Sequence, residues 1–278
     1  MVHEIEVISS LMLESYEIDI SAFGEAFLVR TIEQRMKTVG TDDYQNYHDY
    51  LKVNADEAKT LGESLLINYS RFFRETMTFC LLENFVFPNM VDEKNGGELR
   101  IWSTGCSRGQ EAYSIAILLK ELADESGKEI RFRIFATDIS QSVLDSACAG
   151  VYDFDAVQNI RLKHLEKYFT KVGNKYILSH KIKQHVHFSH YDILDPDTVH
   201  PPESIFGDFD LVICSNLLIY YKPIHQQAIL HRLKQSLAPN GYLVTGEAER
   251  MLVQPGEKLQ AVSAIAPIFR NKQRRKFP

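Results

Sequence analysis

The first third of the chain carries apolar and polar positions at helical spacing. Between residues 28 and 39, one face of the expected helix is apolar and carries Leu28, Val29, Ile32, Met36 and Val39. The opposite face is polar and carries Arg30, Gln34 and Lys37. Two more stretches with this spacing follow, at 44–51 and 57–67. We therefore expect an N-terminal all-α domain over residues 1–88.

From Leu99 onward the pattern changes to alternating strands and helices. Apolar runs predict strands at 99–105, 131–138, 185–194, 209–216 and 242–247. Amphipathic stretches predict helices between them, at 111–125, 141–149 and 223–237. Such alternation is typical of a parallel sheet covered by helices on both faces. We therefore expect an α/β domain with a Rossmann-like sheet over residues 89–278.

One segment interrupts this alternation. Residues 168–186 contain two short strand-like pieces on either side of Gly173 and Asn174, a pair that is typical of a tight turn. The pattern predicts a small β-hairpin inserted between a helix and the next strand of the main sheet.

Composition narrows the class of protein. Hydrophobic residues make up 45% of the 278 residues and charged residues 24%, which is ordinary for a globular protein. The N-terminus is acidic where a signal peptide would be basic, and no apolar run approaches the ~20 residues of a membrane span. We expect a cytoplasmic protein without membrane insertion. The net charge of -6 argues against nucleic acid as a partner.

The residues that could bind metal do not form a convincing set. The four cysteines, Cys80, Cys106, Cys148 and Cys214, are scattered and never form a C-x-x-C pair, so we expect small buried thiols. Four histidines lie close together in the sequence, at 180, 185, 187 and 190, without a cysteine or carboxylate at ligand spacing. We expect structural or surface histidines and no metal.

A glycine turn closes the first predicted strand. It reads Gly105-Cys106-Ser107-Arg108-Gly109, which is not the G-x-G-x-x-G of a dinucleotide fold. Asp138 ends the second strand, where an acid can accept hydrogen bonds from both ribose hydroxyls, and Asp192 follows the third, where it can accept from an adenine amino group. Taken singly, the turn could be a plain strand-to-helix connection and Asp138 a helix cap. Together they favour a nucleoside-bearing cofactor at the carboxyl ends of the strands.

Several motifs resemble one known family. IWSTGCSRGQEAYSIA (101–116) is similar to the first signature of the chemotaxis receptor methyltransferases, the CheR type. INYSRFFRE (67–75) resembles the family's pre-domain signature, and SNLLIYY (215–221) its later strand-end motif. With ATDIS (136–140) and GEAER (246–250), the resemblance covers nearly the whole chain. It implies the expected fold and a protein-glutamate O-methyltransferase that uses S-adenosylmethionine.

The resemblance also implies site residues. The positions implied for cofactor binding are Asn68, Ser70, Arg74, Gly105, Glu111, Asp138, Asp192, Ile193, Ser215 and Asn216. Ser215 stands where an arginine is usual. Arg74 and Tyr220 are the implied catalytic residues: Arg74 steers a carboxylate, and Tyr220 hydrogen-bonds the acceptor. Because Arg74 follows two phenylalanines, we expect it to be partly buried, and we expect Tyr221 to serve strand-end packing.

The partner implied is the cytoplasmic domain of a methyl-accepting chemoreceptor, which presents its glutamates on an acidic helical bundle. Arg30 and Lys37 would complement it as a substrate-recognition face, although a solvated face explains them equally well. The hairpin turn is short, so we expect no tether to a receptor's C-terminal peptide. The family resemblance also favours a monomer.

Alternative functions remain open at this point. The chain could bind S-adenosylmethionine or its product S-adenosylhomocysteine as a sensor or scaffold without turnover, an alternative that Ser215 keeps open. It could methylate a small molecule or a non-receptor protein, although a small-molecule enzyme has less need of a helical domain. An NAD-dependent dehydrogenase is excluded by the glycine spacing.

Overall fold

The computed structural model describes residues 2–66, 69–204, 207–253 and 259–272. It divides the chain into two compact units. The first comprises residues 1–67 and 219–227, and the second comprises 68–218 and 228–278. No helix among the described residues combines the length and apolarity needed to cross a lipid bilayer.

The first unit is helical, as the spacing predicted. Its helices are α1 (Val2–Tyr16), α2 (Glu25–Val39), α3 (Tyr44–Val53) and α4 (Ala55–Leu65). The apolar face predicted for α2 packs inward, with Leu28, Ile32 and Met36 buried. The buried carboxylate of Glu57 binds the Arg35 guanidinium at 2.6 Å and accepts the Tyr47 hydroxyl at 2.8 Å. This pairing satisfies a charge that burial would otherwise destabilise.

A segment from much later in the chain completes this unit. Gly24 donates its N–H to the carbonyl of Tyr220 at 2.8 Å, and Lys222 donates to the carbonyl of Ala22 at 2.9 Å. Tyr221 stacks on Phe23 with ring centroids 5.3 Å apart. Residues 219–227 are therefore held by backbone and ring contacts of the helical unit.

The second unit is built on a mixed sheet. Seven strands of the described residues form it in the order β6-β2-β1-β7-β8-β10-β9. Its parallel strands are β1 (Leu99–Thr104), β2 (Phe132–Asp138), β6 (Val186–His190), β7 (Phe209–Cys214) and β8 (Leu237–Thr245). The antiparallel pair β9 (Leu259–Ala261) and β10 (Ile268–Asn271) extends the edge beyond β8. The alternating pattern predicted the parallel part, and the two C-terminal strands were not predicted.

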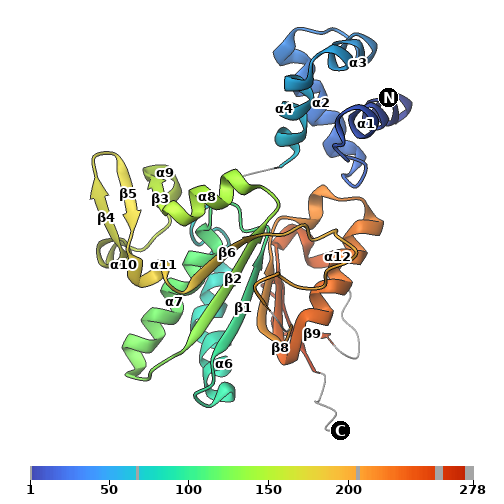
Figure 1. Ribbon diagram of the computed structural model, residues 1–278. Helices are drawn as coiled ribbons and strands as arrows, with labels where there is room; N and C mark the ends of the chain where they lie inside the picture. Colours follow the sequence, from blue (N-terminus) through green and yellow to red (C-terminus); the bar gives the residue numbers. More distant parts are fainter. Residues whose placement is uncertain (1, 67–68, 205–206, 254–258, 273–278) are drawn as a thin grey trace. The chain divides into compact units, whose positions relative to one another are not determined.

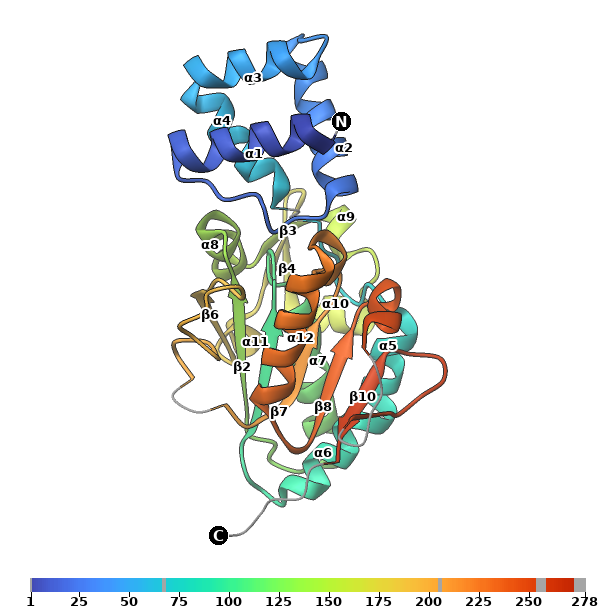
Figure 2. The ribbon, with the colours of Figure 1, turned by 90° about the vertical axis from the view of Figure 1, so that its right-hand side faces the viewer.

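Helices cover both faces of this sheet, which confirms the predicted fold class. Figures 1 and 2 show α6 (Phe87–Lys94) and α7 (Gln110–Ser126) on one face and α12 (Pro223–Ser236) on the other. α8 (Gln141–Ala149) follows β2 and ends at Gly150, as predicted. Two short 3-10 helices follow strands of the sheet, η2 (Leu218–Tyr220) after β7 and η3 (Glu247–Leu252) after β8.

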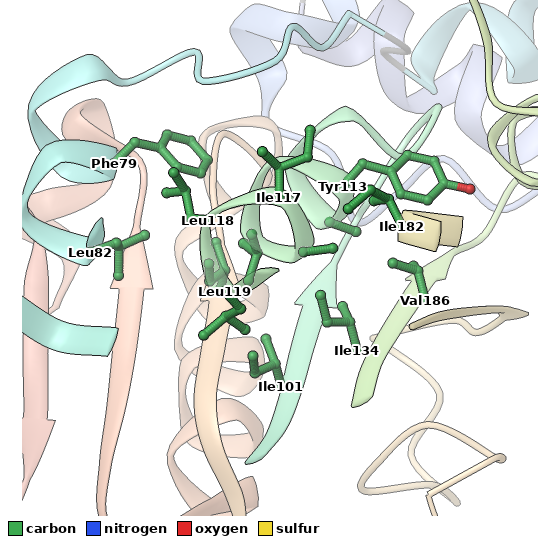
Figure 3. Packing of buried hydrophobic residues seen from close by; sticks show 14 of the residues in the cluster. Phe79, Leu82, Ile101, Tyr113, Ile117, Leu118, Leu119, Ile134, Ile182 and Val186 are labelled. Carbon is green, nitrogen blue, oxygen red and sulfur yellow. The ribbon is translucent and has the colours of Figure 1, made fainter. Parts of the chain in front are cut away.

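The core of the second unit lies between α7, the sheet and the helices that precede β1. These preceding helices are α5 (Thr76–Leu81), the π-helix η1 (Leu82–Val86) and α6. Figure 3 shows Phe79 and Leu82 packed toward Leu118 and Leu119 of α7. Residues 76–94 therefore belong to the second unit, whereas the helical pattern alone had placed the division after residue 88. Their apolar side chains pack in the core that contains α7.

The predicted hairpin insert is present and has a third strand. β4 (Phe169–Val172) and β5 (Lys175–Leu178) pair antiparallel around Gly173, whose φ is 58°. β3 (Val151–Asp153) pairs with the other edge of β5, so the insert is a three-stranded sheet. Short helices surround it, namely α9 (Phe154–Val157), α10 (Leu162–Tyr168) and α11 (His180–Lys183).

Replacing Gly109 by alanine is expected to destabilise the second unit by roughly 2–4 kcal/mol. Gly109 has a φ of 83°, and an added Cβ would lie 2.9 Å from Phe188 and 3.1 Å from Tyr113. Gly127→Ala is the matched control, because its φ is 64° and an added Cβ meets nothing within 4 Å. Urea unfolding should show a loss of about 1 kcal/mol for the control. Equal losses in the two variants would contradict the packing argument.

Candidate active site

Four predicted site residues lie at one edge of the sheet. Gly105 follows β1, Asp138 ends β2, Asp192 follows β6 and Asn216 follows β7. These strands are parallel neighbours in the order β6-β2-β1-β7, so their carboxyl ends meet at the same edge. In open α/β sheets, this edge is where ligands bind.

The glycine turn between β1 and α7 is tied to β2. Gly105 and Ser107 adopt φ values of 60° and 50°. Cys106 donates its N–H to the carbonyl of Thr137 at 2.9 Å, and Ser107 donates to Asp138 Oδ2 at 2.9 Å. The turn and the end of β2 are therefore one hydrogen-bonded unit.

Asp138 is anchored through both carboxylate oxygens. Oδ2 accepts from Ser107, and Oδ1 accepts the N–H of Ser140 at 3.0 Å. Burial raises the pKa of the Asp138 carboxyl, while the N–H groups of Ser140 and Ser107 act in the opposite direction. A carboxylate offers about four accepting positions, so Asp138 can also accept a hydrogen bond from a ligand hydroxyl. Ser140 occupies the N-cap position predicted for α8, but its side chain makes no capping hydrogen bond.

Glu111 is the second residue of α7 and is partly buried. Ser103 of β1 donates its hydroxyl to Glu111 Oε1 at 2.7 Å. Burial, with added repulsion from Glu75 and Glu249, raises the pKa of the Glu111 carboxyl to about 8, although Ser103 and Arg74 oppose the shift. A ligand with a positive charge would restore the ionised form of this acid. Glu111 can therefore pair with a cationic group of a ligand once it has released its proton.

The affinity for S-adenosylhomocysteine is expected to rise with pH up to about 8, the pKa of Glu111, and then to level off. Below this pKa, pairing the ligand's ammonium group with Glu111 must first release a proton. The limiting slope is about tenfold per pH unit. Isothermal titration calorimetry between about pH 6.5 and 8.5 measures this dependence.

Glu111→Gln is the control for this pH dependence. It removes the titrating group, so its binding should be weaker and nearly independent of pH. Without ligand, the raised pKa means that the stability contributed by Glu111 falls as pH rises from 4.5 through about 8. Glu111→Gln should therefore increase the melting temperature above pH 8 more than at pH 6. A flat binding profile in the wild type would contradict the assignment.

The loop after β7 places Asn216 in a left-handed conformation, with φ at 58°. Its N–H donates to the buried carboxylate of Glu249 at 2.9 Å, and Leu218 donates to the same carboxylate at 2.6 Å. Ser215 and Asn216 are both partly buried. This loop faces the glycine turn, because an added Cβ on Gly105 would lie 3.2 Å from Leu217.

Asp192 and Ile193 begin the connection after β6. Asp192 is partly buried and accepts the N–H of Leu194 through Oδ1 at 2.8 Å. Ile193 is buried, and its carbonyl accepts a hydrogen bond from Arg232 of α12. Both residues therefore occupy a fixed turn at the predicted edge.

The segment before α5 brings Ser70 and Arg74 into the second unit. Phe73 donates its N–H to Ser114 of α7 at 3.1 Å. Ser70 is partly buried. Asn68 lies outside the described residues.

The expected partial burial of Arg74 is wrong. Its side chain is exposed, lies 5.6 Å above the Tyr69 ring and donates to the Tyr69 carbonyl at 3.3 Å. The reason is local: Phe72 is fully buried, and Phe73 has a left-handed φ of 51°. The reversal at Phe73 separates the exposed guanidinium from the buried ring of Phe72.

The remaining predicted residues belong to the helical unit. Tyr220 is partly buried, with its ring 4.9 Å from that of Phe27, and Tyr221 has the packing role that we expected, on Phe23. Arg30 and Lys37 are exposed on α2. Their predicted contacts with an acceptor stay predictions.

Three further residues of the second unit were missed. Glu249 and Glu75 accept backbone N–H groups from distant segments, and the buried Ser107 hydroxyl has no hydrogen-bond partner among the described residues. The sequence signal for Glu249 is its place in GEAER (246–250), one of the motifs that carry the family resemblance. Nothing in the local sequence indicated the contact of Glu75.

The cysteines and histidines of the described residues do not form a metal site. Cys106 and Cys214 are buried as expected, whereas Cys80 and Cys148 are exposed on helices. His185 stacks on Phe132 at 4.2 Å. Across the described ranges, no three His, Cys, Asp or Glu side chains gather in a way that could hold a metal ion.

Two family models together match most of the chain. Residues 68–265 match the model described as CheR methyltransferase, SAM binding domain. Residues 3–66 match the model described as CheR methyltransferase, all-alpha domain. The two ranges meet at the first division between the structural units, whereas residues 219–227 of the helical unit fall within the SAM-binding range.

Similar proteins carry related names. Chemotaxis protein methyltransferase 1 of Pseudomonas aeruginosa is 31% identical over 76% of this chain and 76% of its own length. The probable biofilm formation methyltransferase WspC of the same organism is 30% identical over 85% of this chain. An uncharacterized 104.1 kDa protein of Rhodobacter capsulatus is 31% identical over 90% of it. The chain spans 54% of WspC and 26% of the Rhodobacter protein.

Proposed function

The chain belongs to the CheR methyltransferase family, and from this premise we propose that it transfers a methyl group from S-adenosylmethionine to glutamate side chains of methyl-accepting chemoreceptors. The observation that carries this proposal is a pair of acids beside the glycine turn. Asp138 is anchored by two backbone N–H groups, and Glu111 has a pKa raised to about 8.

The residues of this edge fit the cofactor. S-adenosylmethionine supplies an electrophilic methyl group on a cationic sulfonium and carries no phosphate, so a phosphate cradle is not needed. Asp138 would accept the ribose hydroxyls, and Glu111 would oppose the ammonium group. The unpartnered Ser107 hydroxyl lies at the turn that contacts Asp138. Asp192, Ile193, Ser215 and Asn216 would complete the adenosine end, with Asn68 and Ser70 before α5.

The proposed reaction does not require a strong general base from the chain. A glutamate acceptor has an ordinary pKa near ~4.3 and is already ionised at neutral pH. The side chains must therefore orient the acceptor carboxylate and exclude water. Arg74, which is exposed and positively charged, would steer the carboxylate, and Tyr220 would donate a hydrogen bond to it.

The proposed partner is the cytoplasmic domain of a chemoreceptor. Arg30 and Lys37, exposed on α2, would meet its acidic helices, and such rim charges act mainly on association rate. The insert turn between β4 and β5 is short, so we expect no peptide tether, and we expect a monomer. Because WspC is named for biofilm formation, an acceptor outside chemotaxis is the alternative substrate.

One observation, the serine at position 215, supports a second function as a non-enzymatic sensor or scaffold. Ser215 stands where the family's arginine is usual, which removes a cation near the cofactor. A sensor or scaffold that binds S-adenosylhomocysteine without turnover would tolerate this change. Turnover decides between the two functions.

The test is methylation of a purified receptor fragment. The chain is incubated with trideuteromethyl S-adenosylmethionine and the cytoplasmic fragment of a chemoreceptor, and mass spectrometry locates the label. Label on glutamates supports the proposal, and a fragment with those glutamates changed to glutamine is the control acceptor. Binding of S-adenosylhomocysteine without labelling of any acceptor would favour the scaffold.

A further inference from the structure

The carboxylate of Glu249 is fully buried and collects backbone N–H groups from two segments. Oε2 accepts from Asn216 at 2.9 Å and from Gly246 at 2.8 Å, and Oε1 accepts from Leu218 at 2.6 Å. Hydrogen bonds to a carboxylate in a dry environment are stronger than those between neutral groups. Glu249 therefore holds the loop after β7 and the residue after β8 together at the carboxyl edge of the sheet.

The loop after β7 is shaped to receive this carboxylate. Asn216 has a left-handed φ of 58°, a conformation that costs free energy for residues with a side chain, although asparagine adopts it more readily than most. The N–H groups of Asn216 and Leu218 converge on one anion, as in the backbone nests that bind anions. The bonds to Glu249 offset the cost of the left-handed residue.

Gly246 allows the close approach of the two segments. An added Cβ there would lie 2.8 Å from Asn216 Nδ2, 2.8 Å from Glu249 Oε2 and 2.9 Å from Asn216 N. These distances leave no room for a side chain. The Gly246 backbone and the Asn216 side chain are therefore packed directly against each other.

A second acid links the same helix to the segment of Arg74. Glu75 accepts the N–H of Glu247, the first residue of η3, at 3.1 Å. The start of η3 thus contacts the residue after Arg74 and, through Glu249, the loop of Asn216. One short helix connects two motifs that lie far apart in the sequence.

From these contacts we infer that Glu249 is a positioning residue of the cofactor site, which fixes the backbone and thereby the side chain of Asn216. The inference rests on the proposed function, in which Asn216 contacts the cofactor. It assigns Glu249 no contact with ligand, because its oxygens bind the backbone.

Glu249→Gln tests this role. The amide has one accepting oxygen, and its NH₂ would face at least one N–H donor of Asn216, Gly246 or Leu218. We expect S-adenosylhomocysteine binding, measured by calorimetry, to weaken by about tenfold or more. Hydrogen exchange at the Asn216 and Leu218 amides should accelerate. Glu247→Gln is the matched control, because that side chain is 61% exposed, and its binding should be unchanged.

A double-mutant cycle with Asn216→Ala separates positioning from general stability. If Glu249 acts through Asn216, the two losses in affinity will not add, whereas a purely structural effect would add. Gly246→Ala should displace Asn216 and weaken binding similarly. Wild-type affinity in Glu249→Gln, or additive losses, would overturn the inference. Absence of binding by the wild type would instead overturn the proposed function, and the inference with it.

Discussion

Replacing Arg74 by alanine is expected to reduce methyl transfer by about a hundredfold or more, because it removes the charge that would hold a carboxylate in place. The guanidinium is exposed, with one hydrogen bond to the Tyr69 carbonyl and its face over the Tyr69 ring. It can therefore turn toward a ligand without breaking a buried ion pair. Steady-state kinetics with a receptor fragment measure the loss.

Arg71→Ala is the control for this prediction. Arg71 also lies over the Tyr69 ring, at 5.0 Å, so the two variants remove the same charge and a similar ring contact. Only Arg74 occupies the position that the family resemblance assigns to the site. Near-normal turnover in Arg74→Ala, or an equal loss in Arg71→Ala, would contradict the assignment.

Replacing Asp138 by asparagine is expected to weaken S-adenosylhomocysteine binding by roughly a hundredfold. The carboxylate already accepts N–H groups from Ser107 and Ser140 at 2.9 and 3.0 Å. An amide would replace one accepting oxygen with a donor, so one of these N–H groups and one ribose hydroxyl would lose their acceptor. Calorimetry at about pH 8.5, above the pKa of Glu111, measures the affinity without the proton release of that residue.

Asp145→Asn controls for the loss of charge near this site. Asp145 is exposed on α8, where its Oδ1 accepts from Gln141 at 2.8 Å, and it has no proposed contact with ligand. Its binding should match the wild type. If Asp138→Asn binds with wild-type affinity, Asp138 does not recognise the ribose.

The parallel sheet and the position of Asp138 could be predicted because they follow from local patterns. An apolar run of strand length followed by a glycine turn predicts where a strand ends. An acid at the end of the next strand then falls at the same edge of a parallel sheet. The end of α8 at Gly150 could be predicted for a similar reason. Helices commonly end at a glycine with a left-handed φ, and the φ of Gly150 is 63°.

The division between the two units could not be predicted in this way. The helical residues 76–88 were assigned to the N-terminal domain because a helical pattern does not show which core its apolar side chains enter. Phe79 and Leu82 pack toward α7, as Figure 3 shows. These helical residues therefore belong to the second unit, because their side chains are buried in its core.

The contacts of Glu249 and Glu75 were also beyond sequence reasoning. Glu249 reaches Asn216 across 33 residues, and Glu75 reaches Glu247 across 172. Neither contact can be read from the pattern of apolar and polar positions along the sequence. The exposure of Arg74 escaped prediction because it depends on the left-handed φ of Phe73. β3 was not predicted because three residues are too short to show an alternating pattern and because its partner β5 lies about 24 residues further along the chain.

The most direct test of the proposed activity is the chemistry of the transferred methyl group. The purified chain is incubated with methyl-labelled S-adenosylmethionine and membranes of its source cells, and label released as volatile methanol at high pH is counted. Carboxyl methyl esters hydrolyse in alkali, whereas methyl groups on nitrogen do not. The account predicts alkali-labile label on a receptor-sized protein, lost in Asp138→Asn. Alkali-stable label, or no transfer while S-adenosylhomocysteine still binds, would contradict glutamate methylation.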